Sequence, residues 1–302
     1  MGSFAKVLGQ VARVSLETES ANILRTARAN KVPGSLSAKL DETLKNGHDM
    51  KVFGLGTAAS MSTVERYARF THAMAKVYGA MEEELDRTVD TMGDRASASG
   101  YVWKIHGDVL RRAARLEADL ADVEVSADAD AVVPLVPTLV TSPATAAYVT
   151  QIERAGVLDR ETGGGRLVGH LYCRYFADLF GGQMLSMPYR VALGLKRDTP
   201  RHYSFEFPTS APNRRDFIEA VYTSINEAAE TVPLSAEAKE DVVHETMEAF
   251  NANVRVYSED DGLYSDAVRG IGNVATGAIA ELAFRASAAL NGRASPTSPP
   301  RQ

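Results

Sequence analysis

The feature that most constrains this chain is a pair of adjacent glycines inside a long stretch with helical periodicity. Gly181 and Gly182 lie near the middle of residues 167–195, which we predict to form one long helix. Glycine costs about 1 kcal/mol relative to alanine in a helix interior, and Pro188 weakens the same stretch further. A chain tolerates that loss where its backbone must lie close to a flat, bulky group. The stretch therefore predicts a weakened helix beside such a group.

Composition narrows the classes of protein that the chain can belong to. Its 302 residues are 45% hydrophobic, which suits one large domain or two small ones. A net charge of −6 argues against general nucleic-acid binding. The single cysteine, Cys173, excludes an internal disulfide and a multi-cysteine metal site, and it is compatible with a reducing compartment.

Helical periodicity dominates the chain, and strand signals are almost absent. We expect an all-α fold, with one domain over residues 36–262, an extension over 1–35 and a partly disordered tail over 263–302. The other helices that we predict cover residues 36–46, 63–88, 108–122, 143–156, 213–229 and 235–257. Residues 202–208 alternate briefly, and we expect them to be extended.

The two ends of the chain carry separate signals. The first 16 residues contain basic but no acidic side chains and an apolar helical face. This pattern fits an organelle transit peptide or an ordinary amphipathic helix. Lys6 stands where a myristoylation signal requires Ser or Thr, which argues against that modification. Near the other end, residues 270–290 contain Glu281 and Arg285, so we predict an amphipathic helix there and no membrane span.

The stretch from Tyr172 to Gln183 reads YCRYFADLFGGQ. It resembles the distal helix of the heme oxygenases, whose signature is close to YxRYxGDLSGGQ. Further segments resemble that family in the same order, so the resemblance covers about two-thirds of the chain; they are residues 78–87, 102–120, 143–156, 203–226 and 249–257. The resemblance implies a single multi-helix domain that holds heme between a proximal helix and a kinked distal helix.

The resemblance also implies a reaction. Heme oxygenases use heme as substrate and cofactor, and with O2 they cleave it to biliverdin, ferrous iron and CO. Such an enzyme needs an external electron donor, a ferredoxin or a flavoprotein reductase, and we expect a monomer. The compartment stays open between the cytoplasm and an organelle, either mitochondrion or plastid.

Two alternatives remain beside this interpretation. The chain can be a catalytically degenerate relative that acts as a tetrapyrrole-binding or regulatory module. A helical oxygenase with a di-metal site is a weaker alternative, because it requires repeated Glu-x-x-His spacing that the sequence lacks.

Three residues of the motif are the candidate catalytic residues: Asp178, Arg174 and Tyr172. Asp178 follows Arg174 by four residues, and such a pair is commonly a solvated ion pair worth a few tenths of a kcal/mol. The resemblance assigns Asp178 instead to the anchoring of waters on the distal side of the ring. It directs the Tyr172 hydroxyl to a heme propionate or to the same distal network, with a core tyrosine as the alternative.

The resemblance also suggests which residues contact the ring. Gly181 and Gly182 are expected to let the backbone lie against it, with close helix packing as the alternative. Ala177 replaces the family's usual glycine before the aspartate. Phe250 is expected to pack on the ring. By contrast, we expect His170 and Asn253 to be structural, since a histidine on a buried helix face is more often a satisfied core residue.

On the proximal side the resemblance points to His48 as the axial iron ligand. For the propionates, the family usually places Lys and Arg where this chain has Ile218 and Tyr222. Lys45 is then the expected propionate ligand. Arg214 and Arg215, one turn earlier than Ile218, can also supply positive charge.

Overall fold

The computed structural model describes residues 27–47, 50–90, 97–127 and 139–292. Within these ranges the chain forms helices and no strand, which confirms the predicted all-α fold. The segment 202–208 runs without regular secondary structure.

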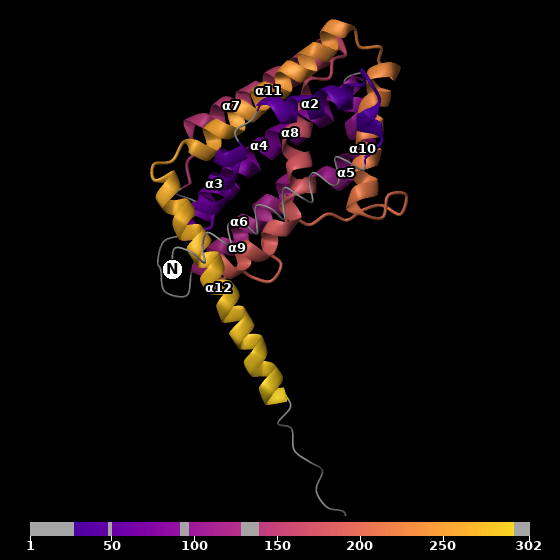
Figure 1. Cartoon of the computed structure of the whole chain (residues 1–302). Coiled ribbons are helices and arrows are strands. Elements are labelled where there is room, and N and C mark those ends of the chain that lie inside the picture. Colours follow the sequence, from indigo (N-terminus) through magenta and orange to yellow (C-terminus); the bar gives the residue numbers. More distant parts are fainter. Residues whose placement is uncertain (1–26, 48–49, 91–96, 128–138, 293–302) are drawn as a thin grey trace, which may run out of the picture.

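Helices follow one another through the described residues (Figure 1). The α-helices are α2 (Leu36–Gly47), α3 (Met50–Ser60), α4 (Val64–Asp90), α5 (Ala98–Leu110), α6 (Ala113–Ala127), α7 (Pro143–Thr162), α8 (Arg166–Phe180), α9 (Ser186–Leu193), α10 (Arg214–Thr231), α11 (Ala236–Ser258) and α12 (Leu263–Gly292). Two short 3-10 helices are η1 (Ala29–Lys31) and η3 (Gly182–Leu185).

Side-chain caps explain several helix starts. Ser97, Ser142, Asn213 and Ser235 precede α5, α7, α10 and α11, and each side chain accepts a hydrogen bond from the backbone N–H three residues later. Such a cap satisfies an N–H group that has no partner inside the helix. Pro143 occupies the first position of α7, where its missing N–H costs nothing.

Helix α8 runs through the interior of the molecule, among α4, α5, α7, α10 and α11 (Figure 1). Of its 15 residues, 13 are buried. Gly169 permits the close approach of α11, because a Cβ at this position would lie 2.7 Å from Oγ1 of Thr246. Any polar side chain on α8 is therefore held in a low-dielectric interior.

The predicted helix over residues 108–122 is wrong, because the chain turns a corner at Arg112 between α5 and α6. The Glu82 carboxylate accepts hydrogen bonds from the backbone N–H groups of Arg112 and Ala113. In turn, the Arg112 guanidinium donates to the carbonyls of Val109 and Leu110 at the end of α5. These contacts satisfy backbone groups that a broken helix would otherwise leave unpaired.

The predicted single helix over residues 167–195 is also wrong. Helix α8 ends at Phe180, the chain tightens into η3, and α9 begins at Ser186. The break falls at the glycine pair, where the helical backbone is least favoured. Helix α3 had no counterpart in the sequence prediction, since its Gly54 and Gly56 and its short length obscure the helical period.

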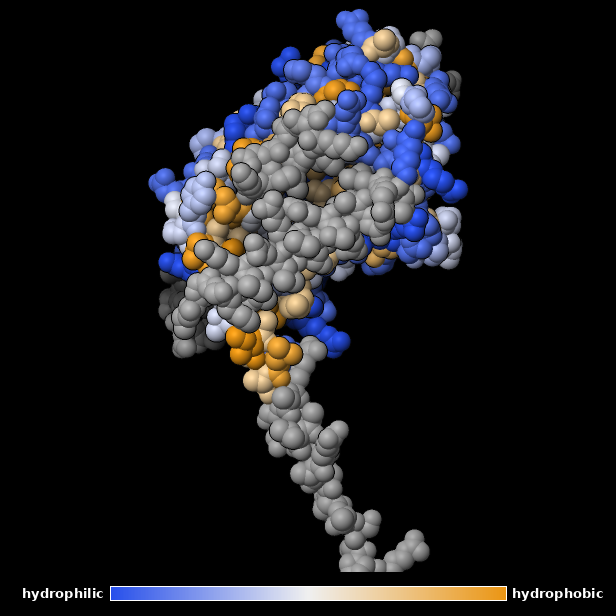
Figure 2. Space-filling model, viewed as in Figure 1, coloured by the Kyte–Doolittle hydropathy of each residue, from blue (hydrophilic) through white to orange (hydrophobic). Residues whose placement is uncertain are grey.

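Helix α12 packs along α3 and α9 and then extends beyond the body of the molecule (Figure 1). Two glycines allow backbone-to-backbone contact: a Cβ on Gly270 or on Gly277 would overlap the carbonyl oxygen of Ala58 or of Val191. Apolar surface is visible where α12 leaves the body (Figure 2), and it includes Ile279 and Leu282. Across the described helices, none combines the length and the apolar character that a membrane span requires.

Candidate functional site

One narrow strip of α8 and its continuation is open, although the rest of the helix is buried. Ala177 is exposed, and Gly181, four residues later, is half-buried. Met184 on η3 extends the strip and is 36% exposed. We call Ala177, Gly181 and Met184 the open strip. Its first two members are among the residues for which the sequence predicts contact with a flat ring, and that contact remains a prediction.

Gly182 faces a side chain of this protein. A Cβ on Gly182 would lie 2.7 Å from Cδ1 and 2.9 Å from Cε1 of the Tyr203 ring. The conformation at this glycine thus allows Tyr203 to pack against the backbone. At Gly182 the described residues therefore show close packing of a protein side chain, which was the alternative to ring contact for the glycine pair.

Asp178 and Arg174 lie inside the protein, in contrast to a solvated ion pair. Each is only 4% exposed. The Tyr78 hydroxyl of α4 donates to Oδ2 of Asp178, and the Arg174 guanidinium lies 5.3 Å from the centre of the Tyr78 ring. Burial opposes the charge on Arg174, but Tyr78, Tyr257 and Asp178 together raise its pKa well above the usual value. Arg174 is therefore a buried cation.

Asn253 completes this arrangement from α11. Its side-chain oxygen accepts a hydrogen bond from Nη1 of Arg174 at 3.1 Å, and its Nδ2 donates to the Tyr148 hydroxyl at 3.0 Å. We call Tyr78, Arg174, Asp178 and Asn253 the Asp178 cluster. Sequence reasoning gave Tyr78 and Tyr148 no role, although both lie in segments that resemble the heme oxygenases.

The motif cysteine is not a reactive thiol. Cys173 is buried beside Asn253, whose Nδ2 lies 3.4 Å from its Sγ. Burial raises the pKa of the Cys173 thiol to about 12. A thiol with that pKa is protonated at neutral pH and is a poor nucleophile.

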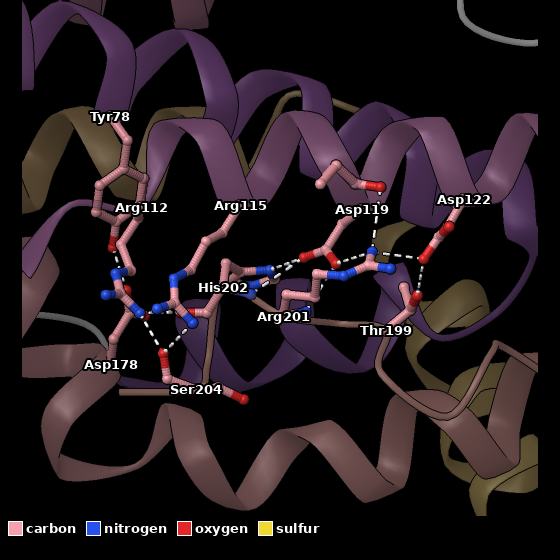
Figure 3. Close-up of polar contacts among 11 residues, drawn as sticks. Tyr78, Arg112, Arg115, Asp119, Asp122, Asp178, Thr199, Arg201, His202 and Ser204 are labelled. Carbon is pink, nitrogen blue, oxygen red and sulfur yellow. Dashed lines mark hydrogen bonds and ion pairs between the residues drawn. The ribbon is translucent and has the colours of Figure 1, made fainter. Parts of the chain in front are cut away.

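A second set of polar contacts holds the loop that carries Tyr203 (Figure 3). Arg112, which is buried, donates to the carbonyl oxygens of His202 and Ser204, and its guanidinium lies 4.0 Å from the centre of the Phe205 ring. The buried Asp119 carboxylate accepts from the backbone N–H of His202, and it lies 2.9 Å from Nδ1 of the same residue. These contacts fix Tyr203 against Gly182.

Tyr172 has a partner that the sequence did not suggest. Its hydroxyl donates to Oδ1 of Asp41 on α2 at 2.6 Å, and the Tyr222 hydroxyl of α10 donates to the same oxygen at 2.6 Å. Asn30 donates to the other carboxylate oxygen. We call Asp41, Tyr172, Tyr222 and Asn30 the Asp41 cluster. The contact expected between Tyr172 and the distal network is therefore not found, and Tyr172 is buried as a core tyrosine would be.

The remaining candidate residues have mixed outcomes. His48 lies outside the described residues; Lys45 lies on α2, but its side chain is outside the described part. Phe250 is buried on α11, and its ring centre is 6.3 Å from that of Phe53. His170 is buried with Nε2 3.0 Å from Oε1 of Glu245, as a structural histidine would be.

The remaining expectations concern cations on α10 and side chains that could bind a metal ion. Ile218 and Tyr222, at the places where the resemblance would put cations, are both buried. Arg214 and Arg215 open α10 one turn earlier. In the part of the chain that the structure describes, no group of three or more His, Cys, Asp or Glu side chains could hold a metal ion. The di-metal alternative therefore gains no support there.

The described chain is all-α, with a broken central helix, buried Arg174 and Asp178 side chains and an open glycine-bearing strip, and comparison with known proteins identifies its family. The family model described as Heme oxygenase matches residues 35–259. The chain therefore belongs to the heme oxygenase family.

Individual relatives are distant. The chain is 28% identical over 239 residues to heme oxygenase 1 of Bos taurus, covering 77% of this chain and 73% of the bovine protein. It is 26% identical over 240 residues to heme oxygenase 1 of Synechocystis sp., covering 76% and 85%. Its fold is similar to that of heme oxygenase 2 from Chlamydomonas reinhardtii, crystallised without heme, with a TM-score of 0.56, 18% identity and coverage of 74% and 96%.

Proposed function

We propose that this protein binds heme along the open strip and cleaves it with O2 to biliverdin, ferrous iron and CO. The observation that carries the proposal is the Asp178 cluster, because it gathers a buried carboxylate, hydroxyl and guanidinium around Asp178, the residue that follows Ala177 on α8. Family membership supports the same reaction. An external electron donor, a ferredoxin or a flavoprotein reductase, belongs to the proposal, and so does a monomeric enzyme.

The residues of this side fit a heme. Both Ala177 and Gly181 are small, with Ala177 exposed and Gly181 half-buried, so a flat ring can lie against the backbone there. His48 would be the axial ligand, and Lys45 would bind a propionate. When bound, heme supplies the iron and oxygen chemistry and is also the molecule that is cleaved.

The protein's own groups would organise protons on this side. Tyr78 occupies Oδ2 of Asp178, and an ionised carboxylate can accept about four hydrogen bonds in all. Asp178 can therefore hold water between itself and the open strip. Arg174 supplies a fixed positive charge, and Asn253 holds its guanidinium in place. Such preorganised groups act strongly because the site is buried.

A heme titration tests the proposal. We expect the wild-type protein to give a sharp Soret band and, after reduction under CO, a ferrous-CO spectrum. His48→Ala should lose the ferric spectrum of an axial histidine complex, and added imidazole should partly restore it. His244→Ala is the matched control, since His244 is exposed on α11. An unchanged spectrum in His48→Ala would eliminate His48 as the ligand.

A second candidate function is a tetrapyrrole-binding or regulatory module without turnover. It is favoured by one observation: Ile218 and Tyr222 are buried where the resemblance expects cations, and Tyr222 is bound to the carboxylate of Asp41. Incubation of the heme complex with a reductant and O2 separates the two functions. An enzyme releases CO and develops biliverdin absorbance, whereas a binding module keeps its heme.

A further inference from the structure

The side of Asp178 that faces Gly182 is covered by the ring of Tyr203. Asp178 and Tyr203 are only 4% and 5% exposed. A Cβ on Gly182 would lie 3.3 Å from Oδ1 of Asp178 and 2.7 Å from Cδ1 of Tyr203. The carboxylate oxygen and the edge of the ring therefore share the space beside Gly182. The other carboxylate oxygen, Oδ2, is the one that accepts from the Tyr78 hydroxyl.

The surroundings of Tyr203 hold its ring in this place. The ring centre is 3.9 Å from that of His202 and 6.1 Å from that of Tyr189 on α9. Nη1 of the buried Arg112 donates to the carbonyl oxygens of His202 and Ser204, the residues on either side of Tyr203 (Figure 3). Ser204 itself is exposed. Tyr203 is thus a buried side chain on a loop segment that reaches solvent.

The group that covers the carboxylate is apolar. The atoms nearest to a Cβ on Gly182 are the ring carbons Cδ1 and Cε1 of Tyr203. Burial raises the pKa of the Tyr203 hydroxyl well above its usual value, and Tyr189 and Asp178 raise it further, so this side chain is neutral at physiological pH. An apolar neighbour keeps water away from a carboxylate, and electrostatic interactions in such surroundings are screened less than in water.

From this arrangement we propose that Tyr203 is a positioning residue for the reaction, which holds the backbone at Gly182 and shields Oδ1 of Asp178 from bulk water on the side of the loop. Protons are then exchanged between Asp178 and the open strip, and bulk water is excluded from this exchange. Exclusion of water limits the leakage of protons into side reactions. One such side reaction releases hydrogen peroxide, which forms when O2 gains two electrons from the reductant and two protons from water. This inference rests on the proposed function, in which Asp178 holds water beside the open strip.

The first test follows amide hydrogen exchange in the heme-free protein by mass spectrometry. It compares wild type with Tyr203→Ala, Tyr203→Phe and the matched control Tyr264→Ala, since Tyr264 is 73% exposed on α12. Tyr203→Ala should speed the exchange of residues 178–186 by about tenfold or more, because the ring that packs on Gly182 is gone. Residues 143–162 of α7 should exchange as in wild type. Tyr203→Phe retains the ring and should match wild type throughout.

The second test measures how reduced oxygen is divided between two products in the heme complex. The same proteins are incubated with heme, a chemical reductant and O2, and the hydrogen peroxide released is compared with the biliverdin formed. A loss of folded protein lowers both products together and leaves this ratio unchanged. Tyr203→Ala should raise the ratio by about tenfold or more, because Asp178 is then open to bulk water. Tyr203→Phe should give the wild-type ratio, and so should Tyr264→Ala.

Three outcomes would overturn the role of Tyr203 and leave the proposed function standing. One is wild-type exchange and a wild-type ratio in Tyr203→Ala. Another is faster exchange with an unchanged ratio, which marks a merely structural residue. The third is a phenylalanine variant that behaves like the alanine variant, because the hydroxyl and not the ring would then be responsible.

Two further results keep the inference separate from folding and from the proposed function. If Tyr203→Ala does not fold, Tyr203→Leu, which has an apolar side chain without a ring, should shift both measurements in the same direction, and wild-type values for it would overturn the role of Tyr203. Wild type that forms no biliverdin would overturn the proposed function. In that case the hold of Tyr203 on Gly182 stands if exchange of residues 178–186 is faster in the variant and falls if it is not.

Discussion

Two buried aspartates, Asp178 and Asp41, accept hydrogen bonds from tyrosine hydroxyls, but their surroundings differ. Asp178 has a charged guanidinium on its own helix, Arg174, and follows Ala177 of the open strip. Asp41 is surrounded by the hydroxyls of Tyr172 and Tyr222 and the amide of Asn30, where α2, α8 and α10 meet. The same pair of residue types thus occurs beside a buried cation in one cluster and among neutral donors in the other, and we propose that only the first takes part in the reaction.

The largest expected difference between the Asp178 and Asp41 clusters comes from substituting the aspartate of each. Asp178→Ala should lower biliverdin formation by about a hundredfold or more, because a positioned proton-transfer group contributes on that scale. Heme binding should stay within about tenfold, or roughly 1.4 kcal/mol. Single-turnover assays with a chemical reductant measure both. A normal biliverdin yield would remove the role assigned to Asp178, whereas Asp41→Asn should keep that yield.

The glycine pair distinguishes the open strip from the packed interior beside it. Gly182→Leu would drive its side chain into the Tyr203 ring, and overpacking costs up to about 3 kcal/mol of unfolding free energy. Gly181→Leu should leave stability near wild type and block heme instead. Urea unfolding of the heme-free variants checks the first effect, and heme titration checks the second. Equal stabilities would show that the two glycines do not differ in this way.

Acid should lower the free energy of unfolding through a buried histidine between α5 and α10. His106 on α5 is buried with Nε2 2.8 Å from Oγ of Ser224 on α10, and burial lowers its pKa to about 4. The unfolded chain, with a pKa near 6.5, takes up the proton first, so stability falls as the pH drops from 6.5 towards 4. The loss should reach roughly 2 kcal/mol at pH 5.

The control for this titration is His106→Gln, which keeps a hydrogen-bonding side chain without a proton to gain in this range. Unfolding free energies measured between pH 7 and 5 should be flatter for the variant. An identical pH dependence in both proteins would assign the acid sensitivity to another group.

The smallest expected effects come from removing one hydroxyl from each cluster. Tyr78→Phe and Tyr222→Phe should each cost about 1 kcal/mol of unfolding free energy, the usual contribution of one hydrogen bond. Only Tyr78→Phe should also slow turnover, since the Tyr78 hydroxyl donates to Asp178 whereas that of Tyr222 donates to Asp41. Loss of turnover in Tyr222→Phe with heme binding intact would show that the two clusters do not differ in their role in turnover.

Local pattern predicted most of the helices, for reasons visible in particular residues. The caps at Ser142, Asn213 and Ser235 and the apolar period of α2 and α4 are local features, so α2, α4, α7, α10 and α11 could be anticipated. The break at Arg112 could not, because it depends on Glu82, which comes 30 residues earlier in the chain.

The sequence by itself determined the class of protein: an all-α chain whose YCRYFADLFGGQ motif places Arg174, Asp178 and two glycines on one stretch. Only the tertiary structure decided the partners of these groups. Tyr78 reaches Asp178 across 100 residues, and Tyr172 reaches Asp41 across 131. Periodicity reports which side of a helix is buried, but a hydrogen bond between distant helices depends on how they pack. For that reason the two tyrosine–carboxylate clusters became visible only in the folded chain.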